Sequence, residues 1–123
     1  MIVVAIIGLL AAIAIPKFAN LTLKAREATV KGKLGTFRAA VNLYYAENEG
    51  LYPQSQASLV PRYVDALPAI GFPAPINHAE TSNVGAVIDD WAIVRAWYYN
   101  GGNGLVVVNC THTDTRGVTW SLY

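Results

Sequence analysis

The chain opens with an apolar run that passes into an amphipathic one without a turn between them. Residues Met1 to Ile15 include no charged or polar side chain, and Pro16 ends the run. Apolar residues then recur at the spacings of one helix face: Leu23, Val30, Leu34, Phe37, Val41 and Tyr44. This pattern predicts a single helix over roughly residues 1–49, ~74 Å long at ~1.5 Å per residue, with Gly50 in the position of a C-terminal cap.

The front of this helix has no polar face, so it must be buried in lipid, in a protein core or among copies of itself. Three interpretations are open: the h-region of a signal peptide, the core helix of a soluble domain, or a membrane span whose first turns lie outside the sequence. No basic n-region precedes the run, and Ala-x-Ala-like sites lie inside it. Core helices usually show a polar face. The amphipathic continuation favours a projecting span, although 15 residues rise only ~22 Å against the ~30 Å of a bilayer core.

After Gly50 the pattern changes to turns and short strands. A short helix is expected at Ser58–Ala66, and the proline-rich stretch 68–83 is expected to be a loop. Four segments have strand character: Val84–Ile88, Trp91–Tyr99, Leu105–Asn109 and Val118–Tyr123. The turn Asn100–Gly104 joins the second and third. We therefore expect an α+β fold, in which the rear half of the helix packs on a sheet of three or four antiparallel strands.

Charge is distributed unevenly along the chain. Hydrophobic residues make up 54% of the 123 residues and charged residues 14%, a composition that argues against disorder. Because the apolar excess is confined to the front of the chain, it also argues against a polytopic membrane protein. Residues 17–38 hold six basic side chains against Glu27 alone, a net +5, whereas the remainder carries a net −4. Segments of opposite sign suit subunits that stack on one another; two solvated faces that differ in charge are the simpler explanation.

Candidate catalytic chemistry is sparse. The sequence contains no Gly-x-Ser-x-Gly, His-Glu-x-x-His, Walker or Cys-x-x-Cys pattern. His78 and His112 lack the spacing of a metal site, and Asp89-Asp90 suits a turn, because adjacent residues of a strand point to opposite faces. Cys110 is the single cysteine and is expected to be buried. We predict no enzyme activity, no catalytic or metal-binding residue, and no cofactor.

Residues Met1 to Phe18 resemble the N-terminal segment of type IV pilins and of the related type II secretion pseudopilins: the apolar order, Gly8 and Pro16 all fit. Tyr44 to Pro53 is similar to the helix exit common to both groups. The family's short basic leader and its mature start, Phe-Thr-Leu-Ile-Glu-Leu, are absent here, and the family's glutamate would lie two residues before Met1. We therefore expect a sequence truncated at its front; six added residues would lengthen the apolar segment to about 21 residues and ~32 Å, enough to span a bilayer core. The alternative is a chain that begins at Met1 and departs from the processing of the family.

The resemblance implies a pilin fold with two parts, a projecting hydrophobic helix over residues 1–22 and a globular head over residues 23–123. It implies a subunit that waits in the bacterial inner membrane with its head in the periplasm, until an assembly machinery extracts it into an extracellular pilus. The basic stretch just outside the membrane conflicts with the positive-inside rule, and a more basic leader would outweigh it. The side chains expected in the filament core are Met1, Ile2, Val3, Val4, Ile6, Ile7, Leu9, Leu10, Ile13, Ile15 and Phe18.

Gly8 and Pro16 are expected to be helix-melting points. Proline in a helix interior costs ~3 kcal/mol and glycine ~1 kcal/mol relative to alanine. We expect the helix to persist in lipid, where broken backbone hydrogen bonds are severely penalised, and to lose its hydrogen bonds over residues 9–15 in the filament. A simple kink at Pro16 is the alternative.

The expected function is that of a structural subunit of a type IV pilus, a helical homopolymer with an adhesion, motility or related surface role and no specific nucleic-acid partner. The alternative within the family is the major pseudopilin of a type II secretion system, which forms a short periplasmic pseudopilus. Major pseudopilins carry calcium in a comparable C-terminal loop, and Thr111–Gly117 offers a single carboxylate, Asp114. A third possibility, from another class, is a membrane-anchored binding module that does not assemble.

Overall fold

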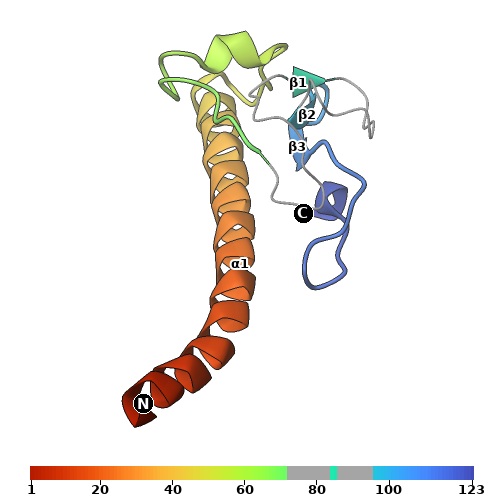
Figure 1. Cartoon of the computed structure of the whole chain (residues 1–123). Helices are drawn as coiled ribbons and strands as arrows, with labels where there is room; N and C mark the ends of the chain where they lie inside the picture. The colour runs from red at the N-terminus through yellow and green to blue at the C-terminus, as the bar shows by residue number, and fades with distance from the viewer. Residues whose placement is uncertain (72–83, 86–95) are drawn as a thin grey trace.

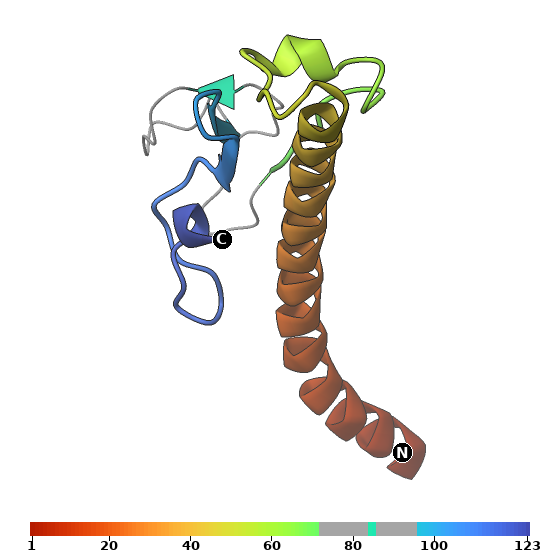
Figure 2. The ribbon, with the colours of Figure 1, turned by 180° about the vertical axis from the view of Figure 1, so that it is seen from behind.

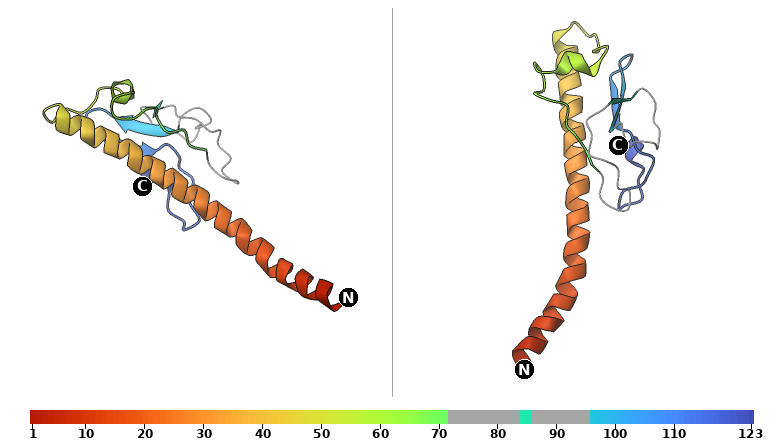
Figure 3. Two further views of the ribbon diagram at one scale, coloured as in Figure 1. Left: turned by 90° about the vertical axis from the view of Figure 1, so that its left-hand side faces the viewer. Right: turned by 45° about the horizontal axis from the view of Figure 1, so that its top comes forward.

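A computed structural model describes residues 1–71, 84–85 and 96–123. One long helix, α1 (Ile2–Glu47), runs the length of the molecule and bends in its N-terminal third, in the stretch that contains Pro16 (Figure 1). The strands and the C-terminal segment lie beside the rear half of α1, and the N-terminal end projects beyond them (Figure 3). The long helix and the α+β layout expected from the sequence are confirmed.

The end of α1 falls slightly before the position expected from the sequence. Asn48 caps the helix by donating hydrogen bonds from both its backbone N–H and its side-chain amide to the carbonyl of Tyr44. Glu49 and Gly50 then take positive φ angles of 54° and 83°. Gly50 therefore lies in the reversal of the chain after the helix, where a glycine adopts this backbone conformation without steric strain.

The rear half of α1 forms one side of the hydrophobic core. Val30, Leu34, Phe37 and Val41 are at most 3% exposed, and they pack against Trp97, Val106, Val108 and Trp120 from the C-terminal part of the chain. Phe37 meets Trp97 edge-on at 5.6 Å between ring centroids, a favoured aromatic geometry. The seven-, four- and three-residue spacing read from the sequence thus defines the helix face that the core covers.

The sheet has three strands in the order β1–β2–β3. Strand β2 (Trp97–Asn100) pairs antiparallel with β3 (Leu105–Val108), and the expected turn at Asn100–Gly104 connects them. Strand β1 (Val84–Gly85), however, runs parallel to β2, so the expectation of a fully antiparallel sheet was wrong. The pattern of β-branched and aromatic residues predicts strands but carries no signal for their direction, and a parallel pair needs a crossover rather than a hairpin. Expected strand positions 86–88 and 91–95 lie outside the described residues.

The expected final strand at Val118–Tyr123 was also wrong. The segment includes a short 3₁₀-helix, η2 (Trp120–Leu122), which lies next to the C-terminus and above the loop that precedes it (Figure 2). Trp120 is fully buried and Tyr123 follows it by three residues, with the two ring centroids 5.6 Å apart. In a 3₁₀-helix residues three apart lie one above the other, so this conformation turns both rings to the same side, which an extended strand would not.

The short helix expected at Ser58–Ala66 is replaced by a 3₁₀-helix, η1 (Gln56–Leu59). Leu59 is fully buried and anchors this turn to the core. Val60 is extended, with ψ of 137°, and precedes Pro61. A residue before proline is biased away from helical ψ angles, so the chain leaves the helix where the sequence-based expectation had continued it.

Candidate functional site: the exposed helix and the polar clamp

The N-terminal part of α1 is an apolar surface without a covering layer within the subunit. Every side chain expected in a filament core is exposed: Ile2 is 77% exposed and Ile6, the least exposed of the set, 54%. In the same helix Phe37 is 0% exposed. One helix therefore has two environments: a rear half with one face buried in the core, and a front half whose isoleucine, leucine and valine side chains are exposed.

A shallow groove follows one side of this front half. Its lining is apolar apart from one cation, and about 510 Å³ of space, open to solvent on one side, lies between Leu10, Ile13, Ala14, Lys17, Phe18 and Leu21. The groove lies wholly on α1, and none of the other elements in the described part of the chain lines it.

Helix α1 continues unbroken through Gly8 and Pro16. No atom outside the local helix backbone lies within 4 Å of a Cβ built on Gly8, so the described residues give this glycine no packing role within the subunit. An intact helix is the state expected before assembly. The loss of helical hydrogen bonds over residues 9–15 concerns the filament and stays a prediction.

Helix α1 is long and apolar enough to cross a membrane. This rests on length and composition, and signal sequences near an N-terminus share both features. The apolar window is entirely exposed in the subunit, whereas the core helix of a soluble protein is mostly buried.

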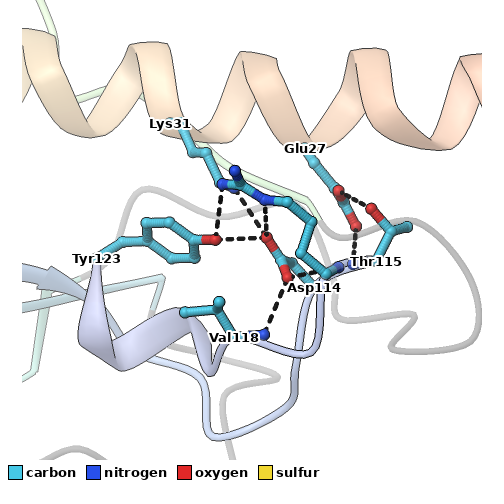
Figure 4. Close-up of polar contacts among 7 residues, drawn as sticks. Glu27, Lys31, Asp114, Thr115, Val118 and Tyr123 are labelled. Atoms are coloured by element: carbon cyan, nitrogen blue, oxygen red, sulfur yellow. Dashed lines mark hydrogen bonds and ion pairs between the residues drawn. The ribbon is translucent and has the colours of Figure 1, made fainter.

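A second constellation joins α1 to the C-terminal loop, and we call it the polar clamp: Glu27, Lys31, Asp114, Thr115 and Tyr123 (Figure 4). The ammonium of Lys31 lies 2.9 Å from the buried carboxylate of Asp114 and 3.9 Å from the centre of the Tyr123 ring. The Tyr123 hydroxyl donates to the same carboxylate. One turn earlier on α1, Glu27 accepts hydrogen bonds from the Thr115 backbone N–H at 2.8 Å and from its hydroxyl at 2.7 Å.

The loop presents Asp114 through its own backbone. The other oxygen of the carboxylate accepts hydrogen bonds from the N–H groups of Arg116 and Val118 at 2.8 and 3.1 Å. Gly117 has a φ of 80° and closes the turn between them. Both carboxylate oxygens are therefore satisfied, and the loop is held in one conformation against α1.

The ionisation of the clamp follows from these contacts. Burial by itself raises the pKa of Asp114, but the hydrogen bonds from Lys31, Tyr123 and the two backbone amides outweigh it and hold this pKa well below the usual range of an aspartate. Burial likewise lowers the pKa of Lys31, and its hydrogen bond and attraction to Asp114 outweigh that effect and raise it. Both groups are charged at neutral pH, and the pair is an ion pair with auxiliary donors.

The six basic residues of positions 17–38 divide into two groups. Lys31, Lys33 and Arg38 bind the head: Lys33 donates to the carbonyl of Ala69, and Arg38 donates to the carbonyl of Val106 at 2.8 and 3.0 Å. Lys17, Lys24 and Arg26 are exposed, and no hydrogen bond or ion pair is found for them within residues 1–71, 84–85 and 96–123. Half of the basic stretch therefore stabilises the fold, and half remains available for a partner.

The sequence-based candidates for metal chemistry are not brought together among the described residues. His112 is exposed, with its Nδ1 3.5 Å from the Sγ of the buried Cys110, so the expectation of a buried thiol is confirmed. His78, Asp89 and Asp90 lie outside the described residues. The Lys31 ammonium and the Tyr123 hydroxyl already bind the Asp114 carboxylate. A calcium ion at Thr111–Gly117 would have to displace both of them.

Sequence reasoning missed the clamp: it treats Glu27 only as the single acidic residue of a basic stretch and Lys31 only as one of the six cations there. The available signal was their spacing: residues four apart on a helix lie on one face, and this face borders the stripe of Val30 and Leu34. Their partners lie 83 and 88 residues away, a separation that no local pattern reveals.

Comparison with known proteins adds no family: no family model, no curated protein and no solved structure matches this chain. The described residues define its class as an α+β protein with one long N-terminal helix, whose rear half packs on a small three-stranded sheet.

Proposed function

We propose that this protein is the structural subunit of a helical filament of the type IV pilus class, and that it polymerises through the front half of α1. The observation that carries the proposal is the contrast along one helix, with a front half exposed around its circumference and a rear half that has one face buried in the core. A folded head that holds such a helix away from itself leaves the apolar side chains to be buried by lipid or by equivalent helices.

The energetics favour association once the helix leaves the membrane. Full burial of a valine, leucine or isoleucine side chain stabilises by roughly 1.5–3 kcal/mol. The front half carries many such side chains, among them Ile2, Val4, Leu9 and Ile13. The joint burial of several of them is of the same order as the ~4–15 kcal/mol by which association is opposed, and this burial is repeated in every subunit of a helical polymer.

A membrane stage precedes assembly in this proposal. The apolar front of α1 lies in the inner membrane and the head faces the periplasm, from which an assembly machinery draws the subunit into an extracellular pilus. The basis is the resemblance of residues 1–18 to pilins, together with the length and apolarity of α1. The head has its own core and clamp on the rear half, so it stays folded while the surroundings of the front half change.

The test is the substitution Ile6→Lys, examined beside Ile6→Leu. Lysine in the filament core would be a buried charge without a partner, so we expect no filaments from Ile6→Lys in negative-stain micrographs of sheared cell-surface material, and normal filaments from Ile6→Leu. The near-ultraviolet circular dichroism of the head should be the same in both variants. Abundant filaments from Ile6→Lys would overturn the proposal.

The major pseudopilin of a type II secretion system remains the alternative. The two functions differ in the length and location of the polymer: deletion of the gene removes long surface fibres in the first case and abolishes secretion of exported proteins in the second. The ion pair between Lys31 and Asp114 supports the pilus, because the pseudopilin comparison rests on calcium in this loop.

A further inference from the structure

The groove on the front of α1 adjoins a polar face that the filament proposal does not use. Lys17 forms part of the groove wall, and Asn20 and Lys24 follow it by three and seven residues. At ~100° per residue these positions fall within about 60° of one another around the helix, whereas Arg26 falls on the opposite side. All three side chains of this face are exposed, and no hydrogen bond is found for them in the part of the chain that the structure describes.

The face lies at the depth of the headgroups if the front of α1 is in a bilayer. Lys17 comes directly after the apolar run, and Lys24 lies ~10 Å further along the helix axis. Side chains on a helix lean toward its N-terminus, so the Lys24 stem points back toward the membrane. Long lysine stems bring their ammonium groups to the interface, where anionic headgroups attract them.

Groove and face together have the chemistry of one amphiphilic ligand. The groove is apolar and open on one side, as an acyl chain requires. Lys17, the one cation among the described residues that line it, lies on the same face of α1 as Asn20 and Lys24. We propose that they bind one anionic phospholipid, with an acyl chain against Leu10, Ile13 and Ala14 and with the phosphate between the Lys17 and Lys24 ammonium groups. This inference rests on the proposed membrane stage, and it names the partner that covers the groove before a neighbouring subunit does.

The binding resolves the charge conflict of the basic stretch. Cations on the translocated side of a membrane oppose the favoured orientation, and a bound phosphate neutralises them. Assembly then exchanges the lipid for an equivalent helix, whose apolar side chains fill the same groove. The lipid thus protects the front of α1 from premature association and leaves when the subunit is extracted.

The test is a competition between two lipids for the full-length chain. The protein in a nonionic detergent is offered equal amounts of phosphatidylglycerol and phosphatidylcholine with the same acyl chains, and native mass spectrometry counts each complex. From the two lysines together we expect about a thirtyfold preference for phosphatidylglycerol, lost in the double variant Lys17→Gln/Lys24→Gln. Arg26→Gln is the matched control, since it removes an exposed cation from the opposite face, and the preference should persist.

Several outcomes would overturn the inference. Equal binding of the two lipids by the unaltered protein would do so, as would an equal loss of preference in Arg26→Gln, because bulk charge rather than a site would then explain it. Glycerol phosphate that competes as well as the lipid would show an anion site without an acyl chain. Dimers in place of lipid complexes would assign the groove to a second copy. If the chain forms filaments but shows no lipid preference, the lipid site is overturned and the proposed function stands. If it shows the lipid preference but forms no filaments, the proposed function is overturned and the lipid site stands.

Discussion

Lys31 and Asp114 form an ion pair across 83 residues of sequence, with the lysine ammonium 2.9 Å from a carboxylate that is fully shielded from solvent. The lysine is on the rear half of α1 and the aspartate is in the loop that precedes η2. Their contact fixes the C-terminal loop to the same helix that carries the exposed front. The orientation of the head relative to the helix therefore depends on this pair as well as on the hydrophobic core.

Asp114→Asn should destabilise the head. The substitution removes the charge that Lys31 and Tyr123 bind, and hydrogen bonds to charged groups contribute ~1.5–3 kcal/mol each before solvent access to the lysine is considered. Because the Lys31 side chain is 27% exposed, water partly replaces the lost partner, and we expect a fall of about 2 kcal/mol in the free energy of unfolding. Urea denaturation followed by near-ultraviolet circular dichroism measures it. Asp65→Asn, at an exposed position, is the control and should leave the midpoint unchanged.

The same aspartate should make the head sensitive to acid. Its pKa is held below the ordinary value in the folded state, so its stabilising effect is fully present above the unfolded pKa of ~3.9 and is lost as pH falls from there toward the folded pKa. We expect the free energy of unfolding to be level from neutral pH to about pH 5 and to decline below it. Asp114→Asn should flatten that decline. An equally steep decline in the variant would assign the acid sensitivity to other carboxylates.

The elements that the sequence predicted well are those encoded by local periodicity. The apolar stripe from Val30 to Val41 identified the buried face of α1, and the turn at Asn100–Gly104 identified the β2–β3 hairpin. Strand direction and the η2 conformation depend on tertiary contacts, because β1 pairs in parallel with β2 and Trp120 is buried in the core. The clamp could not be predicted either, because Lys31 and Asp114 are each ordinary polar residues until the fold brings them together.

Substitution of two glycines of the head tests two different costs, backbone strain alone at Gly117 and strain with steric overlap at Gly104. Gly117 has a φ of 80° with no atom within 4 Å of a built Cβ, whereas at Gly104, with a φ of 69°, a Cβ would overlap the Tyr52 ring. Gly117→Ala should cost ~1–2 kcal/mol for the left-handed backbone alone. Gly104→Ala adds overpacking of ~1–3 kcal/mol. Thermal or urea unfolding of the two variants should therefore rank Gly104→Ala as the less stable. The reverse order would contradict the placement of Tyr52 over the β2–β3 turn.

Phe37→Ala should prevent filament formation because it unfolds the head, since this residue is not among those expected in the filament core. The ring is fully buried between Trp97 and Tyr99, and truncation of a buried phenylalanine costs ~3–5 kcal/mol, a large part of the stability of a small domain. We expect loss of near-ultraviolet circular dichroism and of filaments together. Leu43→Ala, at a position 50% exposed on the same helix, should keep the folded signal. A folded Phe37→Ala head would contradict the central place of this ring in the core.

The final prediction concerns residues 9–15, the weak stretch of α1, in the proposed filament. Pro16 lacks an N–H group and its ring opposes the carbonyl of Ala12, at a cost of ~3 kcal/mol, and Gly8 adds ~1 kcal/mol at the other end of the stretch. Lipid keeps this helix intact because exposed backbone groups find no partner there, but packed neighbours in a filament supply other contacts. We expect a cryo-electron microscopy map of the filament to show residues 9–15 without helical hydrogen bonds. Pro16→Ala restores the missing donor and should keep the helix continuous in the polymer. A continuous helix in the unaltered filament, with a bend at Pro16 alone, would show that proline directs the helix axis and does not melt it.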